Sequence, residues 1–283
     1  MPGSSPFVEV ADGVFLARYR QWDVGVGLVV GRDAALVVDT RAATTQGREI
    51  LDDVRALGLH VGVRHVVNTH VHFDHTFGNR AFGAATVHAH ERVDETFVAD
   101  AERFKALVRS DRHDAPELGY TVADLDDLLG TEVRGPDQTF TTSATVDLGG
   151  RSVVLTHAGR GHTDGDIRVV VPDAGATFLG DLIEESAHPA LGGDSYPLEW
   201  ATTLDRHLAA LPGDLVLPGH GRPVNRAFVA RQRDELAAVA AVIRERHAAG
   251  IPLVDATREP DARLPYPLEG LGAAFERGYA QLD

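Results

Sequence analysis

Three histidines and one carboxylate occur within seven consecutive residues of this chain, Thr69-His70-Val71-His72-Phe73-Asp74-His75. The stretch follows a short apolar run over residues 63–68 that is typical of a buried strand, and Phe77-Gly78-Asn79 after it is a turn signal. Functional side chains are commonly carried by loops that leave a rigid sheet. We therefore expect this motif on a loop at the end of a strand, which limits the folds that the chain can adopt.

Imidazole and carboxylate groups are the ligand types that suit zinc, iron and manganese. The chain contains no cysteine, which excludes disulfide frameworks, thiolate metal sites and cysteine nucleophiles. A metal site in this chain must therefore be built from histidine and carboxylate side chains.

The formal net charge of the 283 residues is −15. This charge argues against nucleic-acid phosphate or an anionic membrane surface as the main partner. No segment approaches about 18 uninterrupted apolar residues, so we expect no transmembrane helix. Residues 1–6 show neither a basic region nor an apolar run, so we expect no secretory signal and a cytoplasmic protein.

The chain before the histidine motif predicts a small set of strands followed by a helix. Glycine and polar breaks favour an antiparallel meander of four strands, over residues 7–10, 14–19, 24–30 and 34–39. Apolar residues at helical spacing predict a helix over residues 44–57. Strands, a helix and then the strand before the motif indicate a layered α/β arrangement.

The chain after the motif begins with a short predicted strand over residues 85–89 and continues with a different composition. Residues 91–130 are acidic and helical in pattern, and we expect them to form either a cap-like insert beside a substrate cleft or a solvent-exposed decoration. A second strand-rich half follows, with strands predicted over residues 145–148, 152–156, 167–171, 177–179 and 215–217. Helices are predicted over residues 198–211 and 225–247, the latter opening a helical segment over 225–283. We expect residues 1–283 to form one domain.

Three further ligand candidates lie near predicted strand ends. His162 lies in a glycine-rich turn after the strand ending at residue 156, Asp181 follows the apolar run Phe178-Leu179-Gly180, and His220 follows Pro218-Gly219. Each residue alone has an ordinary structural role as a turn or capping residue. Together with the first motif they supply five histidines and two aspartates, which suits two metal ions with one shared carboxylate.

These residues resemble the motif set of the metallo-β-lactamase superfamily: His70-x-His72-x-Asp74-His75, Gly-His162-Thr, Gly-Asp181 and Pro-Gly-His220-Gly. The resemblance covers residues from about 7 to about 225. It implies an α/β fold, a four-layer αββα sandwich in which residues 91–130 are a helical insert. It also implies a first metal on His70, His72 and His162, a second on Asp74, His75 and His220, and Asp181 bridging them. Asp39, which ends its strand, would orient a ligand histidine.

The resemblance implies two divalent ions, with zinc expected first and iron or manganese as alternatives, and a metal-bridging hydroxide that Asp74 helps to orient. The expected reaction is hydrolysis of a small acyl substrate: a thioester, ester, lactone or lactam. An aspartate at position 181, with no cysteine, is similar to the glyoxalase II and lactonase branch. A mononuclear-iron persulfide dioxygenase, and a thioesterase or cyclase of secondary metabolism, stay as alternatives. Whether the chain forms a homo-oligomer is left open.

Substrate contacts are harder to predict from the sequence. Ser186, His188 and Tyr196 follow the bridging aspartate and could contact substrate, whereas Asp194-Ser195 could instead cap the helix after residue 198. We expect Trp22 and Trp200 in the core, with a position in the substrate cleft as the alternative. We expect His157 to be a hydrogen-bonded strand-end residue, with a role beside a metal ligand as the alternative. We assign no function to five other histidines and expect them on the surface or on helices: His88, His90, His113, His207 and His247.

Overall fold

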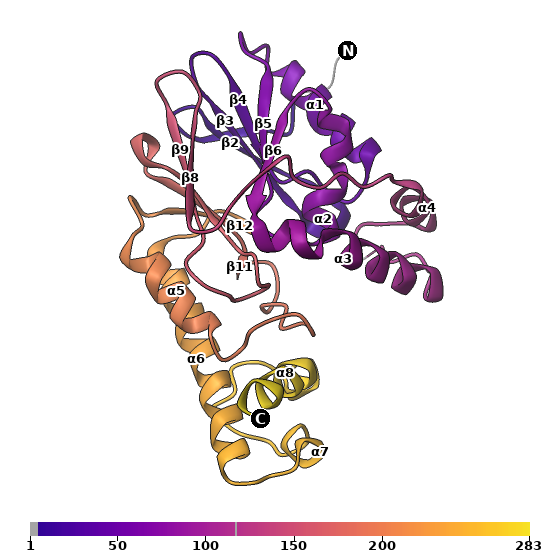
Figure 1. Cartoon of the computed structure of the whole chain (residues 1–283), viewed down its shortest axis with the longest axis vertical. Helices are drawn as coiled ribbons and strands as arrows, with labels where there is room; N and C mark the ends of the chain where they lie inside the picture. The colour runs from indigo at the N-terminus through magenta and orange to yellow at the C-terminus, as the bar shows by residue number, and fades with distance from the viewer. Residues whose placement is uncertain (1–4, 117) are drawn as a thin grey trace.

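The computed structural model describes residues 5–116 and 118–283. Within these residues the chain forms two β-sheets that face each other, with helices on the outer side of each sheet (Figure 1). This arrangement confirms the predicted four-layer αββα sandwich. Residues 1–4, part of the stretch on which the expected absence of a secretory signal rests, lie outside the described residues.

The first sheet contains seven strands in chain order: β1 (Val8–Ala11), β2 (Val14–Arg18), β3 (Gly25–Val30), β4 (Ala35–Val38), β5 (Val63–Val67), β6 (Thr86–His90) and β7 (Gln138–Phe140). Strands β1 to β4 pair antiparallel, which confirms the predicted meander. From β4 to β7 the pairing is parallel, because a helical segment crosses between successive strands. Strand β7 was not predicted, since three residues carry too little apolar pattern.

The second sheet has five strands in the order β12-β11-β10-β9-β8: β8 (Ser143–Asp147), β9 (Ser152–Thr156), β10 (Arg168–Val171), β11 (Ala176–Glu184) and β12 (Leu215–His220). Two expectations were wrong here. Asp181 lies within β11 rather than after it, and His220 is the last residue of β12 rather than beyond it. The glycines that suggested strand ends are accommodated by irregular pairing between β11 and β12 around Gly180.

Eight helices accompany the sheets in the described residues: α1 (Thr44–Ala56), α2 (Phe73–Thr76), α3 (Glu91–Ser110), α4 (Val122–Gly130), α5 (Trp200–Ala209), α6 (Arg226–Ala248), α7 (Leu253–Ala256) and α8 (Gly272–Leu282). Short 3-10 turns occur at Gln21–Asp23, Phe77–Phe82, Pro172–Ala174 and Leu268–Gly270. The helices predicted before the C-terminal segment are confirmed to within a few residues. Of the helices described, none is long and apolar enough to span a bilayer.

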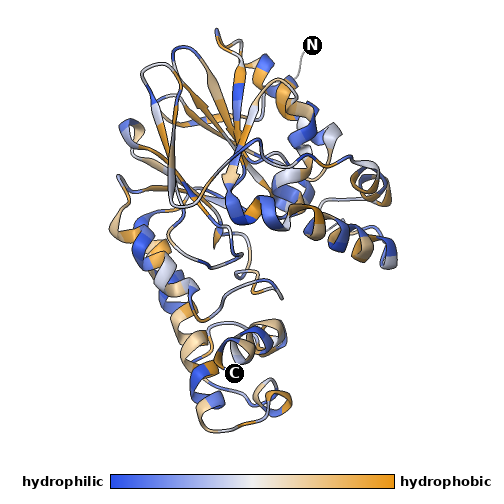
Figure 2. Cartoon of the chain, in the orientation of Figure 1, coloured by the Kyte–Doolittle hydropathy of each residue, from blue (hydrophilic) through white to orange (hydrophobic). Residues whose placement is uncertain are grey.

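Apolar side chains alternate between two cores along the strands of the first sheet. In β4, Leu36 and Val38 join a core shared with the second sheet, whereas Ala35 and Val37 pack toward α1 through Ile50. A third core joins the second sheet to α5, α6 and α8. Figure 2 shows the result, with apolar residues concentrated along the strands. Because both faces are covered, the strands read as nearly continuous apolar runs.

The carboxyl ends of four strands lie together at one edge of the sandwich. Strands β4 and β5 pair in parallel, as do β11 and β12, so the segments that follow them leave their sheets on the same side. A bridge between Val24 and His220 joins the two sheets at this edge. The predicted site residues therefore gather at this edge: Asp181 and His220 from within β11 and β12, and the others from segments that follow strands.

Candidate metal centre

The seven predicted ligands converge at this edge. The chain leaves β5 at Val67, passes through a bend over residues 68–72 and enters the short helix α2, as expected for a strand-end loop. The donor atoms form two groups, and within each group they lie within 4.8 Å of one another. We call them the first donor group (His70, His72, His162 and Asp181) and the second donor group (Asp74, His75 and His220).

The Asp181 carboxylate lies between the two groups. Its Oδ2 atom is 3.7 Å from His70 Nε2 and 3.5 Å from His162 Nε2. Its Oδ1 atom is 3.2 Å from His75 Nε2, and Oδ2 is 3.3 Å from His220 Nε2. One carboxylate is therefore within reach of donors from both groups, which is the geometry expected of a bridging ligand.

Two glycines make this approach of the strands sterically feasible. Gly180 has φ +51°, and a Cβ atom there would lie 2.5 Å from Thr69 Oγ1. A Cβ atom on Gly219 would lie 1.9 Å from Asp181 Oδ1. The glycines of Gly180-Asp181 and Gly219-His220 thus leave room for the carboxylate and for the first loop.

Asp39 orients His75, as predicted. Its Oδ2 atom accepts from His75 Nδ1 at 2.9 Å and from the Thr69 hydroxyl at 2.8 Å, and its Oδ1 accepts from the Thr69 backbone N–H at 2.8 Å. The Thr69 hydroxyl donates to Asp39 and so accepts from His70 Nδ1 at 3.1 Å. Asp39 therefore fixes His75 directly and His70 through Thr69, which leaves both Nε2 atoms facing the site.

The other three imidazoles are held by partners that the sequence did not reveal. His162 Nδ1 donates to the Ala190 carbonyl at 3.2 Å, and His220 Nδ1 donates to the Trp22 carbonyl at 2.8 Å. His72 is turned the other way: its Nε2 contacts Asp194 Oδ2 at 2.9 Å, and its Nδ1 faces His162 Nε2 at 2.8 Å. Asp194 therefore does not cap α5, contrary to one of our alternatives.

Electrostatic surroundings differ between the two groups. Burial lowers the pKa of His162 to about 4, and burial together with the neighbouring His75 lowers the pKa of His70 well below its usual range. Burial would also lower the pKa of His220, but the carboxylates of Asp181 and Asp74 raise it to about 10. His70 and His162 therefore offer neutral imidazoles, whereas the pKa of His72 is raised because the Asp194 carboxylate outweighs the effect of burial. The second group surrounds its carboxylates with a positive charge that a metal ion would replace on proton release.

The donor set fits divalent cations. His70 Nε2 and Asp181 Oδ1 are buried and make no hydrogen bond to any described residue. Such orphaned polar atoms are costly unless another partner binds them. Neutral imidazole nitrogens and carboxylate oxygens are the donors of zinc and iron sites. The residues present therefore suit divalent metal binding.

A cavity of about 650 Å³ opens over both donor groups. Its base includes residues of both groups, among them His72, Asp74 and Asp181. Trp22 and Leu118 contribute apolar surface on one side, and the segment over residues 184–192 lines the other. The predicted helical insert thus contributes to the wall of the cavity through Leu118.

The predicted substrate-contact residues lie in different places. Ser186 lines the cavity, and its hydroxyl donates to Glu184 Oε1 at 2.8 Å. His188 packs beside Tyr266, with ring centroids 5.0 Å apart, and Tyr196 stacks on the Arg160 guanidinium at 4.1 Å, so neither lines this cavity.

Several other side-chain expectations can be compared with the structure. His157 donates to the Asp166 carbonyl at 2.8 Å, as expected. Trp200 is buried, whereas Trp22 is only partly buried and lines the cavity. The expected surface or helical position was wrong for His88 and His90, which lie in β6 and are buried there. His207 lies on helix α5, as expected, on its buried face.

Comparison with known proteins agrees with this arrangement. A model of the metallo-beta-lactamase superfamily matches residues 21–220. The type 2 metallo-beta-lactamase of Bacteroides fragilis is 33% identical over 89 residues, which span 30% of this chain and 36% of that protein.

Solved structures share the fold. The stereoselective inverting sec-alkylsulfatase Pisa1 from Pseudomonas sp. superposes with a TM-score of 0.78 at 17% identity, over 98% of this chain and 50% of that chain. Metallo-beta-lactamases from Pontibacter korlensis and Hirschia baltica each give a TM-score of 0.60, at 20% and 18% identity. They cover 81% and 82% of this chain and 97% of their own. The match to the family model over most of the chain, together with the donor set, shows that this chain belongs to the metallo-beta-lactamase superfamily.

Proposed function

We propose that this protein is a dinuclear metal-dependent hydrolase of small acyl substrates: thioesters, esters, lactones or lactams. Family membership and the histidine and aspartate clusters support a metal-dependent hydrolase. The observation that carries the finer proposal is the position of Asp181, whose carboxylate lies within 3.7 Å of donors from both groups. An aspartate there, in a chain without cysteine, favours the glyoxalase II and lactonase branch.

When bound, two divalent ions lower the pKa of water and polarise a carbonyl oxygen. The chain's own residues supply the remaining functions. His70, His72 and His162 would hold the first ion, and His75 and His220 would hold the second with Asp74. The Asp74 carboxylate lines the cavity and is 3.4 Å from His220 Nε2, so it can orient a nucleophilic water and accept its proton.

The cavity over the two groups suits a small organic substrate. Trp22 and Leu118 provide apolar contacts for an acyl chain, whereas Arg18 and Arg20 bring guanidinium groups to the same lining. The Ser186 hydroxyl, which donates to Glu184, can accept a hydrogen bond from a substrate donor group. This mixture favours a substrate with an apolar part and a polar or anionic part.

The proposal is tested on the purified protein by metal analysis and a substrate screen. We expect close to two metal ions per chain and hydrolysis of one of the thioester, ester, lactone or β-lactam probes, lost on chelation and restored by zinc. A sulfate ester is included because the alkylsulfatase fold matches 98% of this chain and two arginines line the cavity. A single iron, oxygen consumption with a persulfide and no hydrolysis would overturn the proposal and favour a dioxygenase. Turnover of a pathway-specific thioester alone would narrow the function to a biosynthetic thioesterase or cyclase.

A further inference from the structure

The segment over residues 91–130, which contains α3 and α4, lies beside the loop that carries the first motif (Figure 1). Phe104 of α3 stacks on Phe73 with ring centroids 3.6 Å apart, and Phe73 directly precedes Asp74. The segment also reaches toward each donor group by a separate chain of contacts. Each chain ends on a residue that fixes the orientation of one ligand histidine.

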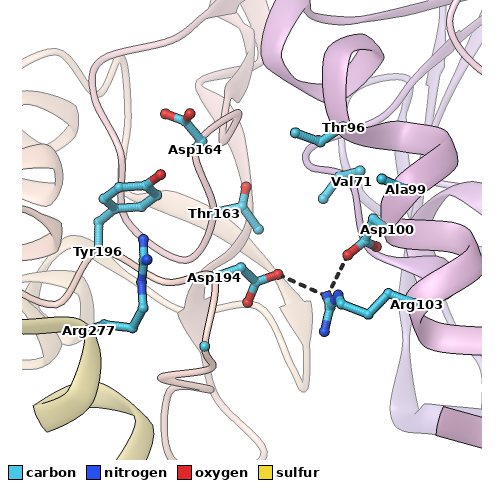
Figure 3. Close-up of a pocket in the computed structure, with 11 residues that line it drawn as sticks. Val71, Thr96, Ala99, Asp100, Arg103, Thr163, Asp164, Asp194, Tyr196 and Arg277 are labelled. Atoms are coloured by element: carbon cyan, nitrogen blue, oxygen red, sulfur yellow. Dashed lines mark hydrogen bonds and ion pairs between the residues drawn. The ribbon is translucent and has the colours of Figure 1, made fainter. Parts of the chain in front are cut away.

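The first chain of contacts runs from α3 to His72. Arg103 Nη2 donates to Asp194 Oδ2 at 3.2 Å, and the same oxygen contacts His72 Nε2 at 2.9 Å. Arg103 also pairs with Asp100 of the same helix. Figure 3 shows Arg103 joined by dashed lines to both carboxylates, at the wall of a pocket of about 350 Å³ that Asp194 also lines.

The guanidinium of Arg103 has a specific effect on Asp194. It is the cation that the carboxylates of Asp100 and Asp194 share, since Asp194 makes no ion pair with any other arginine or lysine of the described residues. Without it, the Asp100 carboxylate would lose this cation, and Asp194 would keep only its contact with His72 and would be drawn toward water. His72 would then lose the contact that turns its Nδ1 atom toward the first donor group.

The second chain of contacts runs from the turn over residues 115–120 to His220. The Trp22 backbone N–H donates to the Leu118 carbonyl at 2.8 Å, and the Trp22 carbonyl accepts from His220 Nδ1 at 2.8 Å. The Trp22 indole stacks on Tyr120, with ring centroids 4.8 Å apart and planes inclined by 19°.

The backbone at Trp22 shows why these contacts are needed. Trp22 and Asp23 have φ values of +56° and +54°. This left-handed conformation is energetically unfavourable for an L-amino acid with a large side chain. Such a conformation persists only when surrounding contacts hold it. The Leu118 carbonyl and the Tyr120 ring are contacts of this kind, and the turn they hold directs the carbonyl that fixes His220.

We propose that Arg103 and Tyr120 are positioning residues for the metal ions: Arg103 acts on the first donor group through Asp194 and His72, and Tyr120 on the second through Trp22 and His220. The assignment of two ions rests on the proposed function. The segment over residues 91–130 is accordingly part of the metal centre rather than a decoration. The two contact chains as traced share no residue, so we expect each variant to affect mainly one ion. They come together at one point, where Trp22 packs edge-on against Phe73, the residue after His72, with ring centroids 5.4 Å apart.

The test measures the zinc retained by each variant across a series of chelator concentrations, together with the visible spectrum of the cobalt-loaded protein. His72→Ala and His220→Ala identify which step of zinc loss belongs to which donor group. The test variants are Arg103→Gln and Tyr120→Leu. The matched controls are Arg109→Gln, exposed on the same helix, and Leu129→Ala, which packs in the same apolar cluster as Tyr120.

We expect Arg103→Gln to weaken retention of the first ion by about two- to tenfold and Tyr120→Leu to weaken the second by a similar factor, with the cobalt spectrum altered in each. The controls should match the wild type. The inference is overturned if both variants retain both ions like the wild type, or if each loses both ions in step with a lowered melting temperature. A wild type that binds one ion contradicts the dinuclear proposal instead. In that case the inference still predicts that only one of the two variants changes its affinity.

Discussion

Asp39→Asn tests how far one buried carboxylate controls the metal centre. Asp39 is 2% exposed and has φ +65°, a conformation that asparagine also tolerates, so the backbone should not change. The asparagine oxygen can still accept from the Thr69 N–H. Its amide nitrogen would face His75 Nδ1, where two donors would then meet in place of a charged hydrogen bond.

The cost follows from that single contact. A hydrogen bond to a charged group contributes about 1.5–3 kcal/mol, and its loss at the 2.9 Å contact to His75 leaves the imidazole free to rotate. Since about 1.4 kcal/mol corresponds to a tenfold change, zinc affinity at the second donor group should fall about 10- to 100-fold. The first group should change less, because Asp39 reaches His70 only through Thr69.

The assay is zinc retention during equilibration with graded chelator, read by metal analysis, with thermal unfolding of the same samples. Asp33→Asn is the matched control, because Asp33 is an exposed carboxylate whose one ion pair among the described residues is with Arg32. An Asp39→Asn variant that keeps both ions with wild-type affinity and melts at the wild-type temperature would refute the role given to Asp39.

Three further outcomes are expected. Asp181→Ala should lower hydrolytic activity by more than about 100-fold with an unchanged far-UV spectrum, and full activity would exclude a bridging role. Gly219→Ala should lose tightly bound zinc, because its Cβ would lie 1.9 Å from Asp181 Oδ1, whereas Gly193→Ala, with no atom within 4 Å, should bind zinc normally. Burial, together with the nearby Arg168, lowers the pKa of His207 from 6.5 to about 3. Below pH 6.5 the unfolded chain therefore binds a proton at this histidine, whereas the native protein does not. The free energy of unfolding should therefore fall by up to about 1.4 kcal/mol for each pH unit from pH 6 to pH 4. Urea unfolding should show a smaller fall for His207→Leu than for the wild type. An equal dependence of the unfolding free energy on pH in both proteins would contradict this.

The fold could be predicted because apolar runs and the family's motifs are both local patterns. The same motifs name the candidate ligands, whose roles stay a prediction. Strands β3 and β4 are buried on both faces and therefore read as apolar runs that end in polar residues. The ligands lie within motifs that also contain the glycines needed for close approach, such as Gly180-Asp181 and Gly219-His220. The resemblance implied that Asp39 would contact a ligand histidine but did not say which one, and the structure shows that it is His75.

Contacts between distant segments could not be predicted in this way. Asp194 contacts His72 across 122 positions in the sequence, and the Trp22 carbonyl reaches His220 across 198. A backbone carbonyl carries no sequence signal, and Asp194 in a turn reads equally well as a helix cap. The extent of β11 beyond residue 179 was missed because its pairing with β12, rather than its local composition, sustains it.

Anomalous diffraction from crystals of the zinc-loaded protein tests the central claim most directly. Two zinc peaks about 3.5–4 Å apart are predicted, one beside His70, His72 and His162 and the other beside Asp74, His75 and His220, with the Asp181 carboxylate between them. A single peak at full zinc occupancy, or two peaks that do not share Asp181, would contradict a dinuclear centre bridged by this residue.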